Sequence, residues 1–201
     1  KQKMTVIYVV RHGKTDDSGK RITGYRMGIH LNREGVQQAS RVAEFLKHFP
    51  ICAVYTSPLE RTMETAEIIA SKHNLPVHPI DSLKEIDFGN YQGKGEELAK
   101  DQLWKLFQEE PASVEFPHGE SVQDAQQRFT NGLNSIIQSH KKSDEIVVVT
   151  HCEVLRLGLA YALKIPLNYY SRLTIDTGSV SKLTWNDDQA SISFINLLTN
   201  Y

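Results

Sequence analysis

The stretch Val6-Ile7-Tyr8-Val9-Val10-Arg11-His12-Gly13 decides how the chain can be interpreted. Its run of β-branched residues is short and is bounded by turn residues, which predicts a buried strand over residues 5–10. The residues that follow the carboxyl end of such a strand are where open α/β sheets bind ligands. An imidazole at that place, between a guanidinium and a flexible glycine, suggests a nucleophile held beside an anion site.

The composition is that of an ordinary globular chain. Its 201 residues suit one domain, with 40% hydrophobic residues, 23% charged residues and a formal net charge of −1. This balance gives no global preference for nucleic acid or an acidic membrane surface, and the apolar stretches are too short to span a bilayer. The start, Lys1 to Met4, has no hydrophobic signal region, and the two cysteines make no disulfide framework. We therefore expect a cytoplasmic protein with a single domain over 1–201.

Strand and helix patterns alternate along the rest of the chain. Helix-start signals are the caps at Asn32 and Ser121 and the capping box in Ser57-Pro58-Leu59-Glu60. Such alternation predicts a mostly parallel sheet with helices on both faces. After the first strand, we predict helices over 33–48, 58–72, 98–109, 122–137 and 153–163, strands over 52–56, 77–80 and 145–150, and two terminal strands over 179–195 that turn at 186–188.

Polar residues follow the ends of three of these strands. Arg11 and His12 follow the first, Arg61 lies in the helix after the second, and His151 follows the strand over 145–150. Neighbouring parallel strands would bring these side chains and the helix N-termini into one pocket. Arginine offers a planar fork to phosphate oxygens, and each charge-assisted hydrogen bond contributes about 1.5–3 kcal/mol. The set therefore suits a phosphate dianion held without a metal.

Phosphoryl transfer to a histidine needs a neutral imidazole and a proton donor. Arg11 and Arg61 would disfavour protonation of His12 and so keep it available. Glu85, in a polar stretch after a short strand, is the candidate that protonates the leaving oxygen; Asp87 is a nearby carboxylate and the alternative. A phosphate dianion beside the acid would raise its pKa to a usable value.

Nearly the whole chain resembles the histidine phosphatase superfamily, the phosphoglycerate-mutase-like proteins. The motifs that carry this resemblance appear in the family's order. They are Arg11-His12-Gly13, the segment 31–39, Tyr55-Thr56-Ser57-Pro58-Leu59-Glu60-Arg61-Thr62, the acid-bearing segment 85–93, Gly119-Glu120-Ser121 and Val149-Thr150-His151.

The resemblance implies a fold and a set of roles. The implied fold is a three-layer αβα sandwich with a mostly parallel central sheet. His12 would be phosphorylated, Glu85 would be the proton donor, and Arg11, Arg61 and His151 would bind the phosphoryl group. No cofactor and no metal is implied.

Several positions near the motifs depart from the family's pattern. Lys14 stands where Glu or Gln is frequent, and Glu153 adds a carboxylate where small residues commonly follow the last histidine. These changes leave the residues for phosphoryl transfer in place, but they leave the identity of the substrate undetermined. Four further residues are expected to contact phosphate or substrate: Ser18, Thr23, Gly24 and Cys152.

Cys152 also invites comparison with cysteine phosphatases. That chemistry needs an arginine six positions on, where this chain has Gly158, and Arg156 is too close. Five other histidines show no metal-ligand spacing: His30, His48, His73, His78 and His118.

We therefore predict a metal-independent phosphomonoester phosphatase that acts on a small phosphorylated metabolite, with no nucleic-acid or membrane partner. A lid over 93–118 would shape its specificity, and the terminal strands allow a homodimer. One alternative is a cofactor-dependent phosphoglycerate mutase. Such mutases usually carry a longer insertion after the acid segment, and here the basic residues of that segment are only Lys94, Lys100 and Lys105. The other alternative is a weakly active, phosphate-binding regulatory homologue.

Overall fold

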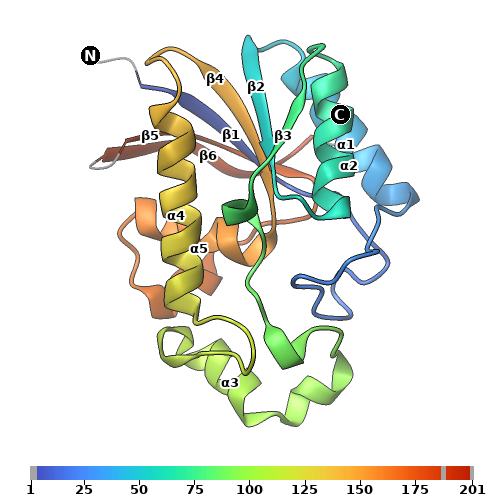
Figure 1. Cartoon of the computed structure of the whole chain (residues 1–201), viewed down its shortest axis with the longest axis vertical. Helices are drawn as coiled ribbons and strands as arrows, with labels where there is room; N and C mark the ends of the chain where they lie inside the picture. The colour runs from blue at the N-terminus through green and yellow to red at the C-terminus, as the bar shows by residue number, and fades with distance from the viewer. Residues whose placement is uncertain (1–3, 187–188, 200–201) are drawn as a thin grey trace.

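A six-stranded sheet between two helical layers forms the centre of the molecule (Figure 1). The computed structural model describes residues 4–186 and 189–199. The strand order is β3-β2-β4-β1-β5-β6. Parallel pairing joins β1 (Val6–Arg11), β2 (Ile51–Thr56), β3 (Val77–Pro79) and β4 (Glu145–Thr150), while β5 (Ser179–Asn186) and β6 (Gln189–Leu198) pair antiparallel. The predicted αβα fold with a mostly parallel sheet is confirmed.

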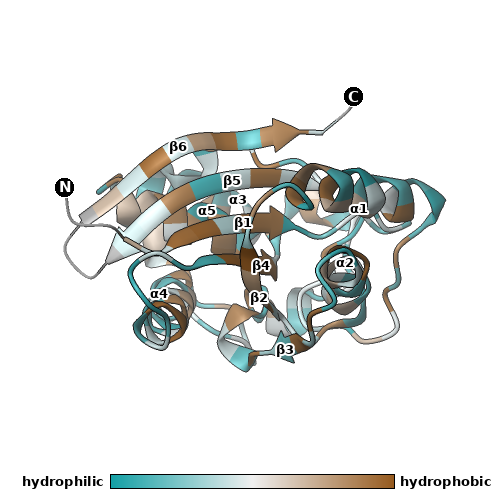
Figure 2. Cartoon of the chain, turned by 90° about the horizontal axis from the view of Figure 1, so that it is seen from above, coloured by the Kyte–Doolittle hydropathy of each residue, from teal (hydrophilic) through white to brown (hydrophobic). Residues whose placement is uncertain are grey.

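Helices cover both faces of this sheet. The helices α1 (Arg33–Leu46) and α2 (Glu60–Ser71) lie on one face, and α4 (Val122–Gln138) and α5 (Cys152–Ala162) lie on the other (Figure 2). The short α3 (Gln102–Glu109) lies below the sheet in Figure 1, at the carboxyl ends of the parallel strands. Short 3-10 turns complete the described elements: Asp81–Leu83, Gly89–Tyr91, Glu96–Lys100, Pro111–Ser113 and Leu167–Arg172.

The central strand β1 is buried on both faces, which explains its continuous apolar run. Ile7 and Val9 pack in the core that contains Phe129 of α4 and the apolar side of α5. Tyr8 and Val10 point the other way, into the core formed with α1 and α2. Alternate side chains of one strand thus hold the two helical layers to the sheet.

Two helix caps agree with the sequence prediction. The Asn32 side chain accepts a hydrogen bond from the Gly35 N–H at 2.9 Å and caps α1. Ser121 Oγ accepts one from the Asp124 N–H at 3.0 Å and caps α4. Each cap satisfies an N–H that the first helical turn leaves unpaired.

The predicted start of the second helix is wrong. The capping box places it at Ser57-Pro58, whereas α2 begins at Glu60 after Leu59, which makes no side-chain cap. The Ser57 hydroxyl lies 2.8 Å from Nε2 of His151 instead. Ser57 Oγ also lies 3.5 Å from the Leu59 N–H, and the extended backbone of Leu59 delays the start of the helix to Glu60.

The predicted helix over 98–109 is also wrong in its first four residues. The chain forms a 3-10 turn over Glu96–Lys100, and α3 begins only at Gln102. Asp101 separates the two because its backbone is extended and its side chain caps α3 through the Trp104 N–H at 2.8 Å. The predicted turn at 186–188 falls partly on residues 187–188, which lie outside the described residues.

The structure can be compared with two expectations from the sequence, that no segment spans a membrane and that the two cysteines form no disulfide. Within residues 4–186 and 189–199, no helix combines the length and the hydropathy needed to cross a bilayer. Cys52 and Cys152 are both free thiols.

Candidate active site

The register of β1 and β4 brings two imidazoles together. Arg11 is paired with Thr150, so the next residues of the two strands, His12 and His151, lie side by side. Their ring centroids are 5.3 Å apart, with the ring planes inclined at 64°. Both side chains are buried, with exposed fractions of 6% and 0%.

His12 has one ring nitrogen engaged by its own loop. Its Nδ1 lies 2.7 Å from the carbonyl oxygen of Gly13. Because a carbonyl only accepts, this contact places the proton of a neutral ring on Nδ1 and leaves the lone pair on Nε2. Burial and the charges of Arg61 and Arg11 hold the pKa of His12 well below its usual range. His12 is therefore a neutral imidazole at neutral pH, with Nε2 as its nucleophilic atom.

His151 is held from the side of β2. Its Nε2 lies 2.8 Å from Ser57 Oγ, while its buried Nδ1 has no hydrogen-bond partner among the described residues. Burial, followed by the charge of Arg61, keeps the pKa of His151 well below normal. This ring thus keeps one polar atom available to a ligand.

Two arginines bring positive charge to the same place. Arg61 has an exposed fraction of 0%; one of its NH groups donates to the Gly24 carbonyl at 2.7 Å, and its Nε and Nη1 have no partner in the described part of the chain. Arg11 donates to the Ile175 carbonyl at 2.6 Å and has an unpartnered Nε. Neither arginine joins any of the ion pairs found among the described residues.

This arrangement of charge is costly unless an anion neutralises it. Burial lowers the pKa of Arg61 to about 10, so the guanidinium is still charged at neutral pH. An ion removed from water without a partner costs several kcal/mol. The unpaired guanidinium donors of Arg61 and Arg11 therefore form a preorganised anion site next to the unpartnered Nδ1 of His151.

The Glu85 carboxyl group lies against the N-terminus of α5. It accepts backbone hydrogen bonds from Ile86 at 3.0 Å and from Glu153 and Val154 at 3.2 Å each. With an exposed fraction of 7%, it has a pKa raised by burial and then by the negative charge of Glu153. Glu85 therefore keeps its proton to a higher pH than an exposed glutamate does.

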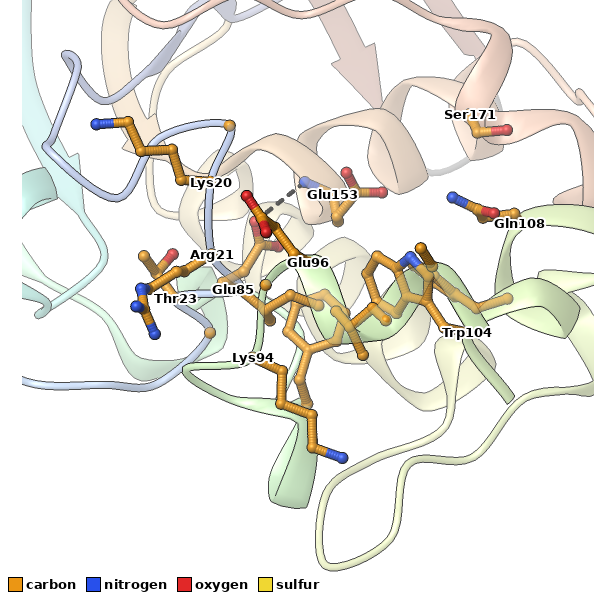
Figure 3. Close-up of a pocket in the computed structure, with 18 of the residues that line it drawn as sticks. Lys20, Arg21, Thr23, Glu85, Lys94, Glu96, Trp104, Gln108, Glu153 and Ser171 are labelled. Carbon is orange, nitrogen blue, oxygen red and sulfur yellow. Dashed lines mark hydrogen bonds between the residues drawn. The ribbon is translucent and has the colours of Figure 1, made fainter. Parts of the chain in front are cut away.

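A cavity of about 740 Å³ opens beside this carboxyl group (Figure 3). Lys20, Arg21 and Thr23 line it from the loop after β1, with the charged ends of Lys20 and Arg21 directed away from Glu85 in this view, and Trp104 lines it from α3. The dashed line in Figure 3 marks the hydrogen bond from the Glu153 N–H to Glu85. The cavity thus combines cations and an aromatic wall next to a protonatable carboxyl.

Comparison with known proteins places this site in a family. A model of the histidine phosphatase superfamily (branch 1) matches residues 7–198. The chain belongs to this superfamily. The resemblance recognised from the motifs is thereby confirmed.

The relatives of this superfamily member carry both mutase-like and phosphatase names. The chain is 40% identical over 156 residues to phosphoglycerate mutase-like protein 4 of Arabidopsis thaliana, which covers 75% of this chain and 67% of that protein. It is 28% identical over 200 residues to phosphoserine phosphatase 1 of Hydrogenobacter thermophilus, covering 96% and 93%. The solved structure of YhfR from Bacillus stearothermophilus superimposes with a TM-score of 0.87 at 27% identity, covering 94% and 95%.

The further predicted contacts lie in two different settings. Thr23 and Gly24 line the cavity together with Glu85, and the Gly24 carbonyl touches Arg61. Ser18 accepts the Thr15 N–H at 2.9 Å, within its own loop. Cys152 lies 3.7 Å from the Ile175 carbonyl, and burial raises the pKa of its thiol to about 12. Ser18 and Cys152 are not among the residues that line the cavity, and neither are His12, Arg11, Arg61 and His151, so the contacts of these six residues with substrate stay predictions.

Asp87, the alternative acid, has a different environment from Glu85. One of its carboxylate oxygens accepts the Gly89 N–H at 3.0 Å, which closes a turn. Its backbone N–H donates to the Glu120 side chain at 2.9 Å. Asp87 thus shapes the loop after Glu85 and is absent from the residues that line the cavity.

The structure adds residues that sequence reasoning did not assign to the site. Arg128 on α4 donates to the Glu85 carbonyl at 3.0 Å and pairs with Glu120 at 2.6 Å, which holds the acid-bearing segment in place. Tyr170 and Arg156 donate to the two carboxylate oxygens of Glu153 at 2.6 Å and 2.9 Å. Ser57, expected as a helix cap, contacts His151. Only the pair Glu153 and Arg156, three positions apart on α5, has a spacing that the sequence could have indicated; the other contacts join more distant positions.

Proposed function

We propose that this protein is a metal-independent phosphomonoester phosphatase that works through a phosphohistidine on a small phosphorylated metabolite. One observation carries the proposal: a neutral His12 with Nε2 free lies among buried, unpaired arginine donors. Phosphoryl transfer needs mainly positioning and charge stabilisation, which these groups supply. The superfamily membership and the phosphatase names of relatives support the same reaction class.

In the first step, the substrate phosphate replaces the missing partners of Arg11, Arg61 and His151. The Nε2 lone pair of His12 forms a bond to phosphorus while the bond from phosphorus to the ester oxygen breaks. That oxygen takes the proton of the Glu85 carboxyl and leaves as an alcohol. The Gly13 carbonyl stabilises the cationic ring through Nδ1–H.

In the second step, the ionised Glu85 takes a proton from a water molecule. The water oxygen bonds to phosphorus as the phosphorus–nitrogen bond breaks, and His12 returns to its neutral form. Inorganic phosphate leaves, and Glu85 is protonated again. One carboxyl group therefore serves as acid and then as base.

The test is turnover of an aryl phosphate by His12→Ala, with His30→Ala as a matched control. His30 is an exposed histidine that pairs with Glu64 at the surface. We expect turnover to be lost in His12→Ala and kept in His30→Ala, and an acid-labile phosphoryl group to be trapped only on proteins that keep His12. Near-normal turnover by His12→Ala would refute the mechanism, and loss of turnover on chelation, with circular dichroism showing that the chain stays folded, would refute its metal independence.

A phosphoglycerate mutase is the second candidate. The name of the Arabidopsis relative favours it, and Lys20, Arg21 and Lys94 line the cavity where a substrate carboxylate would lie. The segment over 92–118 argues against a mutase, because it is short and offers little to shield a phosphoenzyme from water. A coupled assay with 3-phosphoglycerate separates the two: hydrolysis releases phosphate, whereas a mutase isomerises faster than it releases phosphate.

A panel of phosphorylated metabolites would identify the substrate. The cavity accommodates more than a phosphate group, and its mixed wall of cations and aromatic rings does not select one alcohol. A protein that binds phosphate but traps no phosphohistidine would fit the weakly active regulatory alternative. The cytoplasmic location, the homodimer and the lid over 93–118 stay predictions.

A further inference from the structure

A second group of chemically active side chains lies at the other end of the sheet. Cys52 is near the amino end of β2, and His140 and Asp144 lie in the turn that joins α4 to β4. The pair His12 and His151 follows the carboxyl ends of the strands, so this group is separate from the proposed active site. Asp144 lies four positions after His140, but nothing in the sequence links this pair to Cys52, which is 88 positions away from His140.

The three side chains converge on one point. Nδ1 of His140 lies 3.0 Å from Oδ2 of Asp144 and 4.0 Å from Sγ of Cys52. All three donor atoms lie within 4.8 Å of one another. In a tetrahedral zinc site with bonds of about 2.0–2.3 Å, ligand atoms are roughly 3.3–3.7 Å apart. The observed separations lie on either side of that range, so small side-chain rotations would complete the geometry.

The imidazole is already oriented for this role. Nε2 of His140 lies 2.8 Å from the Tyr55 hydroxyl, and the two rings meet edge to face at 85°. This contact turns Nδ1 toward Cys52 and Asp144. Asp144 is fixed as well, since it accepts the Lys141 N–H at 3.0 Å. Metal-binding histidines are commonly held in this way through their second nitrogen.

We propose that Cys52, His140 and Asp144 bind a divalent cation of the zinc class, with Tyr55 orienting His140. The donors would be a thiolate, an imidazole and a carboxylate, a set that suits zinc and does not suit the all-oxygen sites of magnesium or calcium. Cys52 is exposed while His140 is largely buried, which leaves the outer side of the site open to a water ligand. The bound ion would tie the α4–β4 turn to β2.

The test uses the full chain, reduced and freed of metal, titrated with Co²⁺ as a spectroscopic probe. We expect one equivalent to produce a thiolate-to-cobalt charge-transfer absorption, which Zn²⁺ then displaces. Cys52→Ser should lose this absorption, and Cys152→Ser, the matched control, should keep it. Absence of a stoichiometric absorption in the unaltered chain, or its survival in Cys52→Ser, would overturn the proposal.

Two further measurements separate a metal site from a simple hydrogen-bond network. Zn²⁺ should raise the thermal unfolding temperature of the unaltered chain and of Cys152→Ser but not of Cys52→Ser. Tyr55→Phe should weaken Zn²⁺ binding by about 10–100-fold, as loss of an orienting partner does elsewhere. If Tyr55→Phe bound Zn²⁺ with unchanged affinity, Tyr55 would have no role in orienting His140. If Zn²⁺ left the unfolding temperature of the unaltered chain unchanged, the proposed link between the α4–β4 turn and β2 would be contradicted.

Discussion

Glu153 acts on the proposed chemistry through its charge. Tyr170 and Arg156 hold its carboxylate, and that negative charge helps to raise the pKa of Glu85. Glu153→Gln removes the charge, so the pKa of Glu85 should fall. Glu85 must be protonated when the alcohol leaves, and the alkaline limb of the pH profile for alcohol release should therefore move to lower pH.

The measurement is single-turnover alcohol release over a range of pH. Glu96→Gln is the matched control, because Glu96 lines the same cavity and is not among the causes that shift the pKa of Glu85. An alkaline limb that moves equally in both variants would show that Glu153 has no specific influence on the acid.

The identity of the acid is a separate question at the same scale. Glu85→Gln should lower kcat/KM by about 10²–10⁴-fold for an alkyl phosphate, the range attributed to general acid–base catalysis. The loss should be smaller for an aryl phosphate, whose leaving group needs less help from a proton. Asp87→Asn keeps the oxygen that closes the turn to Gly89 and should retain most of the activity.

Steady-state kinetics on both esters checks this assignment. A larger loss in Asp87→Asn than in Glu85→Gln would transfer the acid role to Asp87. Equal losses of kcat/KM, which reports alcohol release and not the later hydrolysis of the phosphoenzyme, on alkyl and aryl esters would instead indicate that Glu85 positions the loop without donating a proton.

Individual residues differ in how far the sequence could predict their position. His12, His151 and Arg61 follow strand ends in recognisable motifs. The expectation that these strands pair in parallel was therefore sufficient to predict that the three side chains lie close together. Arg128 was not predicted to serve the site, because its contact with the Glu85 carbonyl joins positions 43 residues apart without a motif. Side-chain to backbone contacts of this kind depend on the packing of α4, which local sequence patterns do not specify.

Among the elements, α4 and α5 are coupled through a glycine. A Cβ added to Gly158 of α5 would lie 2.4 Å from the ring of Phe129 on α4. Alanine normally stabilises a helix interior by roughly 0.5–1 kcal/mol relative to glycine. Overpacking costs about 1–3 kcal/mol, so Gly158→Ala should lower the free energy of unfolding.

Urea denaturation checks this balance, with the double variant Gly158→Ala, Phe129→Leu as the comparison. The smaller side chain at 129 should recover part of the lost stability by making room for the methyl group. A stabilised Gly158→Ala would mean that helix propensity outweighs the contact between the two helices.

Element boundaries show where local signals are reliable. The caps at Asn32 and Ser121 were predicted correctly, although each of these side chains also donates to a carboxylate, Asn32 to Asp16 and Ser121 to Asp124. The Ser57 cap failed because the backbone of Leu59 is extended, so α2 begins only at Glu60, and Ser57 Oγ lies 3.5 Å from the Leu59 N–H. The helix over 98–109 failed over its first four residues because the extended backbone of Asp101 separates a 3-10 turn from α3. Both failures depend on backbone conformations of the folded chain that local capping signals do not specify.

For the whole molecule, the buried imidazoles make stability depend on pH. The pKa of His12 lies well below 6.5 in the folded chain, so between these values the unfolded chain binds the extra proton. The neutral His12 ring therefore contributes its full share to the free energy of unfolding at any pH above the pKa that His12 has in the unfolded chain. This contribution is lost as the pH falls below that pKa. We expect the free energy of unfolding to fall between about pH 7 and pH 5.

Replacing one imidazole isolates its contribution from those of the other titrating groups. Denaturant unfolding of the unaltered chain and of His12→Asn should give a weaker acid dependence in the variant, because one group that resists protonation has been removed. Parallel pH curves for the two proteins would contradict the low pKa of His12.

The alignment of Arg11 with Thr150 also has a kinetic consequence. The two histidines are far apart in the sequence, so they meet only after β1 and β4 have paired over a long loop. A slip of one residue would turn one imidazole to the other face of the sheet. During refolding, phosphate binding should therefore return no earlier than the pairing of β1 with β4. The rate at which activity recovers would then measure the slowest long-range step of assembly.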